Sequence, residues 1–228
     1  MSQSLTLRPI ARIHTEFSEK FGIPRQSGLV EELSARIVLE PAYRVREALR
    51  GIEGFSHLWL LWQFTESRGW SPTVRPPRLG GNQRVGVFAT RSPFRPNPIG
   101  LSCVKLDRVD WDAPDGPVLV VRGADLLDGT PLFDIKPYVP LADCRPEAVG
   151  GFSDLHREDR LTVDFPERLL AQVPKEKRAA LLGVLSQDPR PSYQHDPQRV
   201  YGMAFAGLEV KFTVAGETLQ VRDVLAKK

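Results

Sequence analysis

Apolar and polar residues alternate in short runs along the chain as far as Tyr138. This two-residue period, with β-branched and aromatic side chains in the runs and Gly and Pro between them, predicts β-strands. One segment of this part, residues 43–49, has a helical pattern instead. Many short strands at close spacing favour a barrel or a sandwich over a parallel α/β sheet. The predicted strands are residues 5–14, 35–40, 55–64, 84–90, 101–109, 118–126 and 132–138.

The pattern changes after Tyr138. A stretch with Gly and many charges over residues 150–160 indicates a boundary between a domain at 1–150 and a smaller domain at 151–228. The smaller part mixes helical and alternating patterns and is predicted to be α+β. It has predicted helices at 166–173 and 174–185 and predicted strands at 200–206, 208–215 and 218–224.

The composition is typical of a compact soluble enzyme. With 228 residues, 41% of them hydrophobic and 26% charged, the chain is long enough to bury a core. No apolar run approaches the roughly 20 residues that span a bilayer, and residues 1–9 lack the apolar centre of a signal peptide. We therefore expect a cytoplasmic protein that does not enter a membrane.

The two cysteines, Cys103 and Cys144, lie far apart in the sequence, and no CxxC or His-rich spacing occurs. This pattern predicts reduced thiols and no metal site. A disulfide between the two cysteines is the alternative.

A stiff and basic segment lies in the middle of the chain. Three prolines between residues 93 and 98 fix the backbone, so that Arg91, Arg95 and Asn97 would be presented from a preformed loop. Residues 68–105 contain six Arg and one Lys but no Asp or Glu, although the net charge of the chain is only +3. This local excess indicates an anionic partner. A rigid surface turn with solvated arginines is the alternative.

Five long motifs occur along the chain in the order PRQSGLV, GFSHLWLLWQF, WSPTVRPPRLGGNQRVGVFATRSPFRPNPIGLS, DLLDGTPLFDIKPYVP and QDPRPSY. Together they closely resemble the TrmO family, also called YaeB or TsaA-like, of tRNA N6-methyltransferases that use S-adenosylmethionine. The resemblance implies a mainly β fold, with a single-sheeted β-barrel methyltransferase domain and a small C-terminal α+β domain that helps to hold tRNA. It also implies a homodimer. The implied reaction is methyl transfer to N6 of the adenosine at position 37, next to the anticodon, which already carries a threonylcarbamoyl group.

The same resemblance implies which residues bind S-adenosylmethionine. The chain has no GxGxxG turn, so the methyl donor would be held in another way. Arg25 could pair with the carboxylate of the donor, and an Asp in the stretch before Gly129 could accept hydrogen bonds from its ribose or ammonium group. The implied donor-binding residues are Pro24, Arg25, Gln26, Thr65, Glu66, Arg91, Leu101, Asp125, Leu126, Leu127 and Asp128.

Some of these residues have an ordinary structural interpretation. Thr65 and Glu66 differ in type from relatives, which can have His-Gln at these positions, so contacts through their side chains would not be kept. Leu101 alone is more typical of a core, and Asp before Gly129 is ordinary turn chemistry.

Asp134, Lys136 and Tyr138 are the predicted catalytic residues. The two-residue period of a strand places them on one face, where a carboxylate, an ammonium group and a phenol would converge. Methylation needs N6 held in line with the sulfonium methyl group, and positioning can supply much of the rate. Asp134 could take or orient the N6 proton, with Lys136 acting on it electrostatically. An exposed strand face without a catalytic role is the alternative.

The predicted contacts with the substrate lie in two loops. Arg95 and Asn97 belong to the proline-rich loop, and Asp188, Arg190 and Tyr193 belong to QDPRPSY. Arginine suits phosphate, and a tyrosine can stack on an unstacked base of single-stranded RNA. Asp188 and Arg190 could instead pair with each other as a structural clamp.

Two other classes of function are compatible with the sequence. The first is an RNA-binding protein without catalysis, which the presence of all three predicted catalytic residues disfavours. The second is a methyltransferase of another small molecule or of a protein, for which the basic segment would be incidental.

Overall fold

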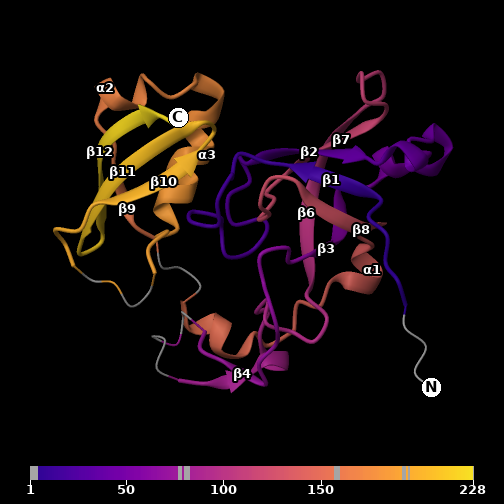
Figure 1. Ribbon diagram of the computed structural model, residues 1–228, viewed down its shortest axis with the longest axis horizontal. Helices are drawn as coiled ribbons and strands as arrows, with labels where there is room; N and C mark the ends of the chain where they lie inside the picture. Colours follow the sequence, from indigo (N-terminus) through magenta and orange to yellow (C-terminus); the bar gives the residue numbers. More distant parts are fainter. Residues whose placement is uncertain are drawn as a thin grey trace.

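The computed structural model describes residues 5–76, 79, 83–156, 160–191, 194 and 196–227. Its larger part is a closed antiparallel barrel with the strand order β1-β2-β7-β6-β3-β8 (Figure 1). The mainly β fold predicted from the sequence is confirmed, and of the two predicted arrangements the barrel is the one formed. The barrel strands are β1 (Ala11–His14), β2 (Ser34–Leu39), β3 (His57–Gln63), β6 (Ile99–Asp110), β7 (Val118–Arg122) and β8 (Thr130–Pro137).

Alternation along each strand fills the barrel. In β3, Leu58, Leu60 and Trp62 point into the core, whereas Trp59 and Leu61 between them are only partly buried. Burying such side chains on one face drives the strand to this register, since a one-residue slip would expose all of them. The hydrophobic pattern that predicted the strands therefore also selects the face that packs.

Three predicted elements differ in the structure. Residues 5–10 are not a strand: the pairing of β1 with β2 and with β8 begins at Ala11. The strand predicted at 84–90 was wrong: β5 (Val85–Gly86) pairs with the two-residue β4 (Thr73–Val74) and gives way to a 3₁₀ helix. The helical pattern at 43–49 forms short 3₁₀ helices instead of an α-helix. The short helices of this part are η1 (Pro41–Tyr43), η2 (Arg46–Leu49), η3 (Ile52–Gly54), η5 (Val87–Ala89), α1 (Pro140–Asp143) and η6 (Gly151–His156).

The C-terminal part is a four-stranded sheet with two helices packed against it (Figure 1). The predicted hairpin and the strand after it are present, and a short parallel strand that the sequence pattern did not predict joins their edge. Ala180, Leu181, Val184 and Leu185 form the buried side of the second helix, as the spacing predicted. The elements are β9 (Thr162–Asp164), α2 (Glu167–Leu170), α3 (Lys175–Ser186), β10 (Tyr201–Phe205), β11 (Leu208–Ala215) and β12 (Thr218–Ala226).

The long connection between β1 and β2 packs into the C-terminal core. Phe17, Val30 and Leu33 are buried in the same hydrophobic cluster as the C-terminal helices and sheet. The ring of Phe17 meets that of Phe205 edge to face, with centroids 5.7 Å apart. Figure 1 shows this connection between the barrel and the C-terminal sheet. The two parts of the chain are thus joined by a shared core as well as by the polypeptide.

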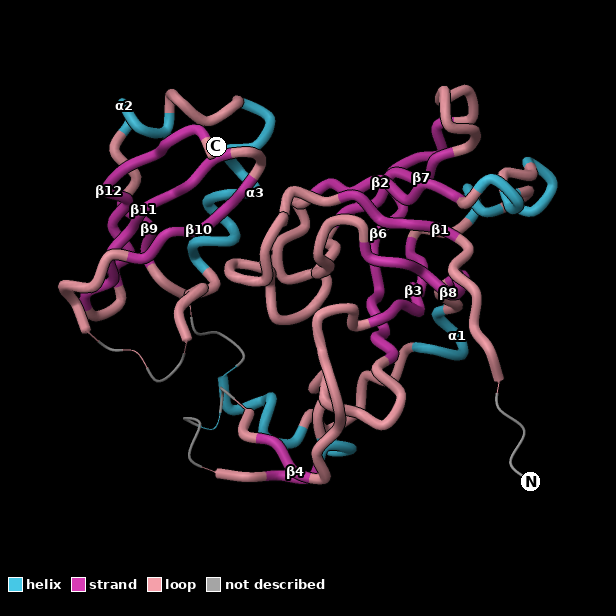
Figure 2. Tube along the Cα trace, in the orientation of Figure 1, coloured by secondary structure: helices cyan, strands magenta, loops and turns pink. Residues whose placement is uncertain are grey.

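The segment between β3 and β6 leaves the barrel as an arm made mostly of loops (Figure 2). Backbone hydrogen bonds tie its two limbs together, from Ser71 to Phe94 and from Val87 to Pro72. Three large apolar side chains of the arm are exposed: Trp70, Phe88 and Phe94. Among the helices of the described residues, none is both long enough and apolar enough to cross a bilayer.

Candidate active site

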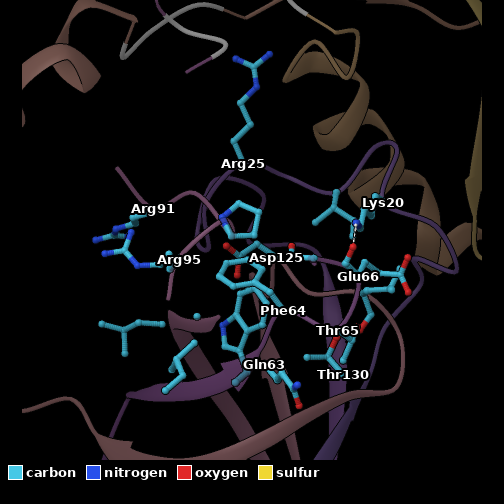
Figure 3. A pocket seen from close by; sticks show the side chains of 18 of the residues that line it. Lys20, Arg25, Gln63, Phe64, Thr65, Glu66, Arg91, Arg95, Asp125 and Thr130 are labelled. Atoms are coloured by element: carbon cyan, nitrogen blue, oxygen red, sulfur yellow. Dashed lines mark hydrogen bonds between the residues drawn. The ribbon is translucent and has the colours of Figure 1, made fainter. Parts of the chain in front are cut away.

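A cavity of about 510 Å³ opens at one end of the barrel, where four connections meet (Figure 3). The antiparallel order brings the end of β1, the end of β3, the start of β6 and the end of β7 to this side of the barrel. Ligand cavities are typically of this size and lie at such mouths. The lining residues fall within 20–26, 62–67, 90–101 and 125–130.

Two aromatic rings form part of the apolar wall of the cavity. Trp62 and Phe64 have ring centroids 4.3 Å apart, tilted by 59°. Gly100 lies against the indole: a Cβ added there would be only 2.3 Å from Trp62 Cε2. The absence of a side chain at Gly100 therefore allows the indole to lie flat on the β6 backbone.

Asp125 places a carboxylate in the cavity. Arg91 and Arg95 lie on one side of it, and Lys20 and Glu66 lie on the other (Figure 3). Ser102 Oγ donates a 2.6 Å hydrogen bond to Asp125 Oδ1. Burial raises the pKa of this carboxyl, whereas the hydrogen bond from Ser102 and the nearby Arg91 act in the opposite direction. The net shift of the Asp125 pKa is upward, because desolvation outweighs the contacts that stabilise the ionised form. Such shifts are common for carboxyls at functional sites.

Basic side chains form the rim. Arg91 Nη1 donates a 2.6 Å hydrogen bond to Gln26 Oε1 and so links the arm to the β1–β2 connection. Arg95 Nη1 donates to the carbonyls of Val87 and Thr90, at 3.1 and 2.7 Å, and stiffens the proline-rich loop. Guanidinium groups at a rim of this kind suit a carboxylate or a phosphate.

The C-terminal part reaches this rim. Arg25 Nη2 lies 3.4 Å from the backbone oxygen of Asp188, and Arg190 makes two hydrogen bonds to the carboxylate of Asp188, at 2.8 and 2.9 Å. This pairing raises the pKa of the Arg190 guanidinium. Asp188 itself adopts a left-handed backbone conformation, with φ of 49°. The ion pair therefore stabilises a strained turn, and the backbone oxygen of Asp188 connects this turn to Arg25.

Comparison with protein families matches both parts of the chain. Residues 12–144 match the family described as the tRNA-methyltransferase O N-terminal domain, and residues 158–227 match the TrmO C-terminal domain. The chain belongs to the TrmO family. The resemblance inferred from the five motifs is thereby confirmed.

Relatives of this TrmO-family chain carry informative names. It is 41% identical over 228 residues to the "tRNA (adenine(37)-N6)-methyltransferase" of Escherichia coli K12. The alignment covers 96% of this chain and 97% of the relative. It is 41% identical over 159 residues to the "Probable S-adenosyl-L-methionine-binding protein" of Pyrococcus abyssi, covering 69% of this chain and 82% of that one. A crystal structure of TrmO from Pseudomonas aeruginosa superposes with a TM-score of 0.79 at 33% identity, over 98% of this chain and 100% of that chain.

Most of the donor-binding residues that the TrmO resemblance implied lie together at the cavity. Leu126 and Asp128 are not among the lining residues: Leu126 is buried in the barrel core, and Asp128 accepts a 3.0 Å hydrogen bond from the Thr15 amide. At the Thr65 and Glu66 position, Lys20 Nζ donates to the backbone oxygen of Glu66, an interaction that does not depend on residue type there. The predicted residues that line the cavity are Pro24, Arg25, Gln26, Thr65, Glu66, Arg91, Leu101, Asp125 and Leu127.

Several further lining residues were not among the predicted site residues of this TrmO-family chain. Trp62 lies on the same inward face of β3 as Leu58 and Leu60, so the alternation of the strand alone assigned it to the core. Trp62 is the last inward residue before β3 ends, and this position could have indicated that it lines the mouth of the barrel. The lining residues that were not predicted are Lys20, Ile23, Trp62, Gln63, Phe64, Ser67, Thr90, Pro93, Ile99, Gly100 and Thr130.

The predicted catalytic residues lie on the outer face of the barrel, beside the cavity and not within its lining. Leu101, Leu61 and Asp134 form one row across β6, β3 and β8. With strands about 4.8 Å apart, Asp134 is roughly 10 Å from Leu101 at the edge of the cavity. Lys136 Nζ pairs with Asp134 Oδ2 at 2.8 Å.

Tyr138 follows the end of β8 and contacts another aromatic ring. Its centroid lies 5.8 Å from that of Trp59, which faces outward on β3. Desolvation raises the pKa of the Tyr138 phenol, and Cys144 and Asp143 add to the effect. The phenol is therefore suited to donate a hydrogen bond and not to act as a base at neutral pH. Neither Cys144 nor Cys103 forms a disulfide.

The predicted substrate contacts are divided between the two parts. Arg95 lines the cavity, and Asn97 is exposed in the same loop. Asp188 and Arg190 pair with each other in the C-terminal part, and Tyr193 lies outside the described residues. Among those residues no group of three or more His, Cys, Asp or Glu could hold a metal ion.

Replacement of Arg91 by Ala is expected to weaken binding of S-adenosylmethionine about tenfold, because one charge-assisted hydrogen bond is worth about 1.5–3 kcal/mol. Isothermal titration calorimetry measures the effect. Arg50→Ala, an exposed arginine outside the lining of the cavity, is the control. Unchanged affinity in a folded Arg91→Ala protein would remove this residue from the site.

Replacement of Gly100 by Ala is expected to weaken donor binding and to lower stability by about 1–3 kcal/mol, because the new methyl group displaces the Trp62 ring. Thermal unfolding and calorimetry report the two effects. Gly54→Ala is the matched control, since a Cβ at Gly54 meets no atom within 4 Å. Equal behaviour of the two variants would show that the indole can move without cost.

Proposed function

We propose that the cavity holds the methyl donor of a tRNA methyltransferase. The chain is an S-adenosylmethionine-dependent tRNA (adenine(37)-N6)-methyltransferase, as its similarity to the E. coli relative over almost the whole length indicates. The observation that carries the placement of the donor is the clustering of nine implied donor-binding residues around one cavity. A donor bound there would contact the mouth of the barrel, the arm and the β1–β2 connection at once.

The side chains of the cavity fit the groups of S-adenosylmethionine. Guanidinium groups of Arg91 and Arg25 suit its carboxylate, the carboxylate of Asp125 suits an amino group, and the rings of Trp62 and Phe64 suit packing of its adenine. When bound, the donor supplies an electrophilic methyl group on a sulfonium. The protein has to orient that methyl group, exclude water and position the acceptor nitrogen.

We propose that the acceptor adenosine lies on the outer face of β3 and β8. Leu101 and Leu61 lead from the edge of the cavity to Asp134, and the exposed flank of Trp59 and Tyr138 offers rings on which a base can stack. Asp134 then accepts or orients the proton of N6, while Lys136 pairs with its carboxylate. This arrangement supports a catalytic role for the three residues.

The finer features of the substrate are also proposals. We propose that the accepted adenosine already carries a threonylcarbamoyl group on N6 and that the C-terminal part, with Asp188, Arg190 and Tyr193, helps to hold the anticodon loop. The absence of acidic residues from 68 to 105 supports a contact with RNA phosphates. We place the activity in the cytoplasm, where tRNA is available.

We propose that the protein works as a homodimer. Exposed apolar side chains gather beside the cavity, on the arm and at the start of β6, and such patches commonly mark protein interfaces. Sedimentation equilibrium tests this proposal, since a mass of one chain at all concentrations would contradict it. The exposed residues are Trp70, Phe88, Phe94, Ile99 and Leu101.

The reaction is tested with labelled S-adenosylmethionine and two matched tRNAs, one with threonylcarbamoyladenosine and one with plain adenosine at position 37. Digestion and nucleoside analysis then locate the label. Label on N6 in the first tRNA alone is the expected result, and equal label in both would contradict the need for the earlier modification. Donor binding without transfer would indicate another acceptor, whereas neither binding nor transfer would favour an RNA-binding protein. Binding of tRNA is expected to fall steeply with ionic strength, unlike that of a small acceptor.

A further inference from the structure

A chain of three side chains connects the barrel core to the cavity. Trp62 Nε1 donates a 3.0 Å hydrogen bond to Ser102 Oγ, and Ser102 Oγ donates a 2.6 Å hydrogen bond to Asp125 Oδ1. Trp62 and Asp125 line the cavity, whereas Ser102 lies behind them and is only 1% exposed. No motif that suggested the function assigned a role to Ser102.

The direction of these hydrogen bonds is fixed by the chemistry of the three groups. An indole nitrogen can only donate, and an ionised carboxylate can only accept. The Ser102 hydroxyl accepts from Trp62 and has one proton to give, which therefore goes to Asp125. Ser102 lies in an apolar interior, since Leu58, Leu60 and Val104 nearby on β3 and β6 are buried.

We propose that Ser102 is a positioning residue, which holds the carboxylate of Asp125 ionised and aimed at an amino group of the bound methyl donor. The proposal rests on the function proposed above, in which this cavity holds the donor. Ser102 itself does not touch the donor: it acts through Asp125.

The electrostatic surroundings make this role necessary. Burial raises the pKa of Asp125 and so favours the neutral carboxyl, which attracts a positively charged amino group poorly. The groups that oppose burial are Ser102, the backbone amides of Asp125 and Ser27, and the charge of Arg91. The loss of the Ser102 donor would raise this pKa further.

Several other charged groups line the cavity beside Asp125. The β1–β2 connection contributes Lys20 and Arg25, the arm contributes Arg91 and Arg95, and Glu66 lies across the cavity with an exposed side chain. The cavity lining contains no His or Cys among the described residues. Since Glu66 is a second carboxylate in the lining, the Asp125→Asn variant is needed to assign a change in donor affinity at acidic pH to Asp125.

The test is the pH dependence of S-adenosylmethionine binding, measured by calorimetry on the full chain. For the wild type, affinity rises as the pH rises through the pKa of Asp125. Ser102→Ala is expected to move this rise to higher pH, with affinity at weakly acidic pH about tenfold lower than that of the wild type, the usual effect of losing a hydrogen bond to a charged group. Ser102→Thr keeps the hydroxyl and should keep the wild-type profile. In Asp125→Asn, which cannot ionise, the rise should vanish.

Thr213→Val is the matched control. Thr213 is also buried, with a hydroxyl that accepts a 3.0 Å hydrogen bond from Arg222, but it lies in the C-terminal sheet. Circular dichroism and thermal unfolding confirm that each variant is folded. An unshifted profile in folded Ser102→Ala would overturn the proposal, as would the same shift in Thr213→Val. If Ser102→Ala does not fold, a shifted profile in Ser102→Thr would overturn it. Failure of the wild type to bind the donor would instead overturn the proposed function.

Discussion

Replacement of Asp134 by Asn is expected to slow single-turnover methyl transfer about 100-fold, because a positioned acid or base typically contributes that much or more. The change keeps the shape of the side chain but removes the charge that pairs with Lys136. Because Asp134 lies on the outer face of the barrel and not in the cavity lining, donor affinity should stay nearly constant. Rapid mixing of enzyme, S-adenosylmethionine and modified tRNA separates the chemical step from binding.

The control for Asp134 is Asp110→Asn. Asp110 is an exposed carboxylate at the end of β6, and its loss should leave the rate unchanged. Normal single-turnover rates in folded Asp134→Asn would leave the outer face of β8 without a catalytic carboxylate. A loss of donor affinity instead of rate would place Asp134 in the donor site.

Replacement of Phe17 by Ala is expected to lower the free energy of unfolding by about 3–5 kcal/mol, the usual cost of removing a buried Phe side chain. Phe17 is 1% exposed and packs against Phe205 of the C-terminal sheet, although it follows β1 of the barrel. Since residues 15–33 connect β1 to β2, loosening them should also weaken the barrel.

Two probes of urea unfolding separate these effects. All four tryptophans lie before residue 112, so their fluorescence reports on the barrel and its arm, whereas far-ultraviolet circular dichroism reports on the whole chain. Phe17→Ala should shift both transitions together. Leu141→Ala, at a side chain that is 93% exposed, should shift neither. A shift in circular dichroism alone would show that the two parts unfold independently.

Local periodicity predicted the barrel strands well where each strand had both a buried face and a partner. In β2 and β3 the buried positions alternate along the whole strand, and in β6 they do so as far as the bulge between Leu106 and Arg108. The predicted bounds of these strands differ from the observed ones by only a few residues. Residues 84–90 have the same composition, but the strand that could pair with them is two residues long. Strand propensity without a partner therefore gave a 3₁₀ turn.

The site was predicted through motifs and not through periodicity. Single residues such as Arg25, Arg91 and Asp125 meet because connections far apart in the sequence converge at one end of the barrel. No local sequence pattern indicates at which end of the barrel these connections meet. The motifs did not reveal the roles of Ser102 and Phe17. Ser102 ends the third motif but looks like an ordinary strand serine, and Phe17 looks like a loop residue. Both acquire their roles from long-range packing.

The shared core has a consequence for the order of events during synthesis. Phe17, Val30 and Leu33 leave the ribosome early, but the strands that bury them are the last part of the chain to be made. The barrel can close once β8 pairs with β1, while these three apolar side chains still face solvent. A nascent chain at this stage exposes an aggregation-prone apolar surface to chaperones and to other chains. This surface becomes buried once β10 to β12 have been made.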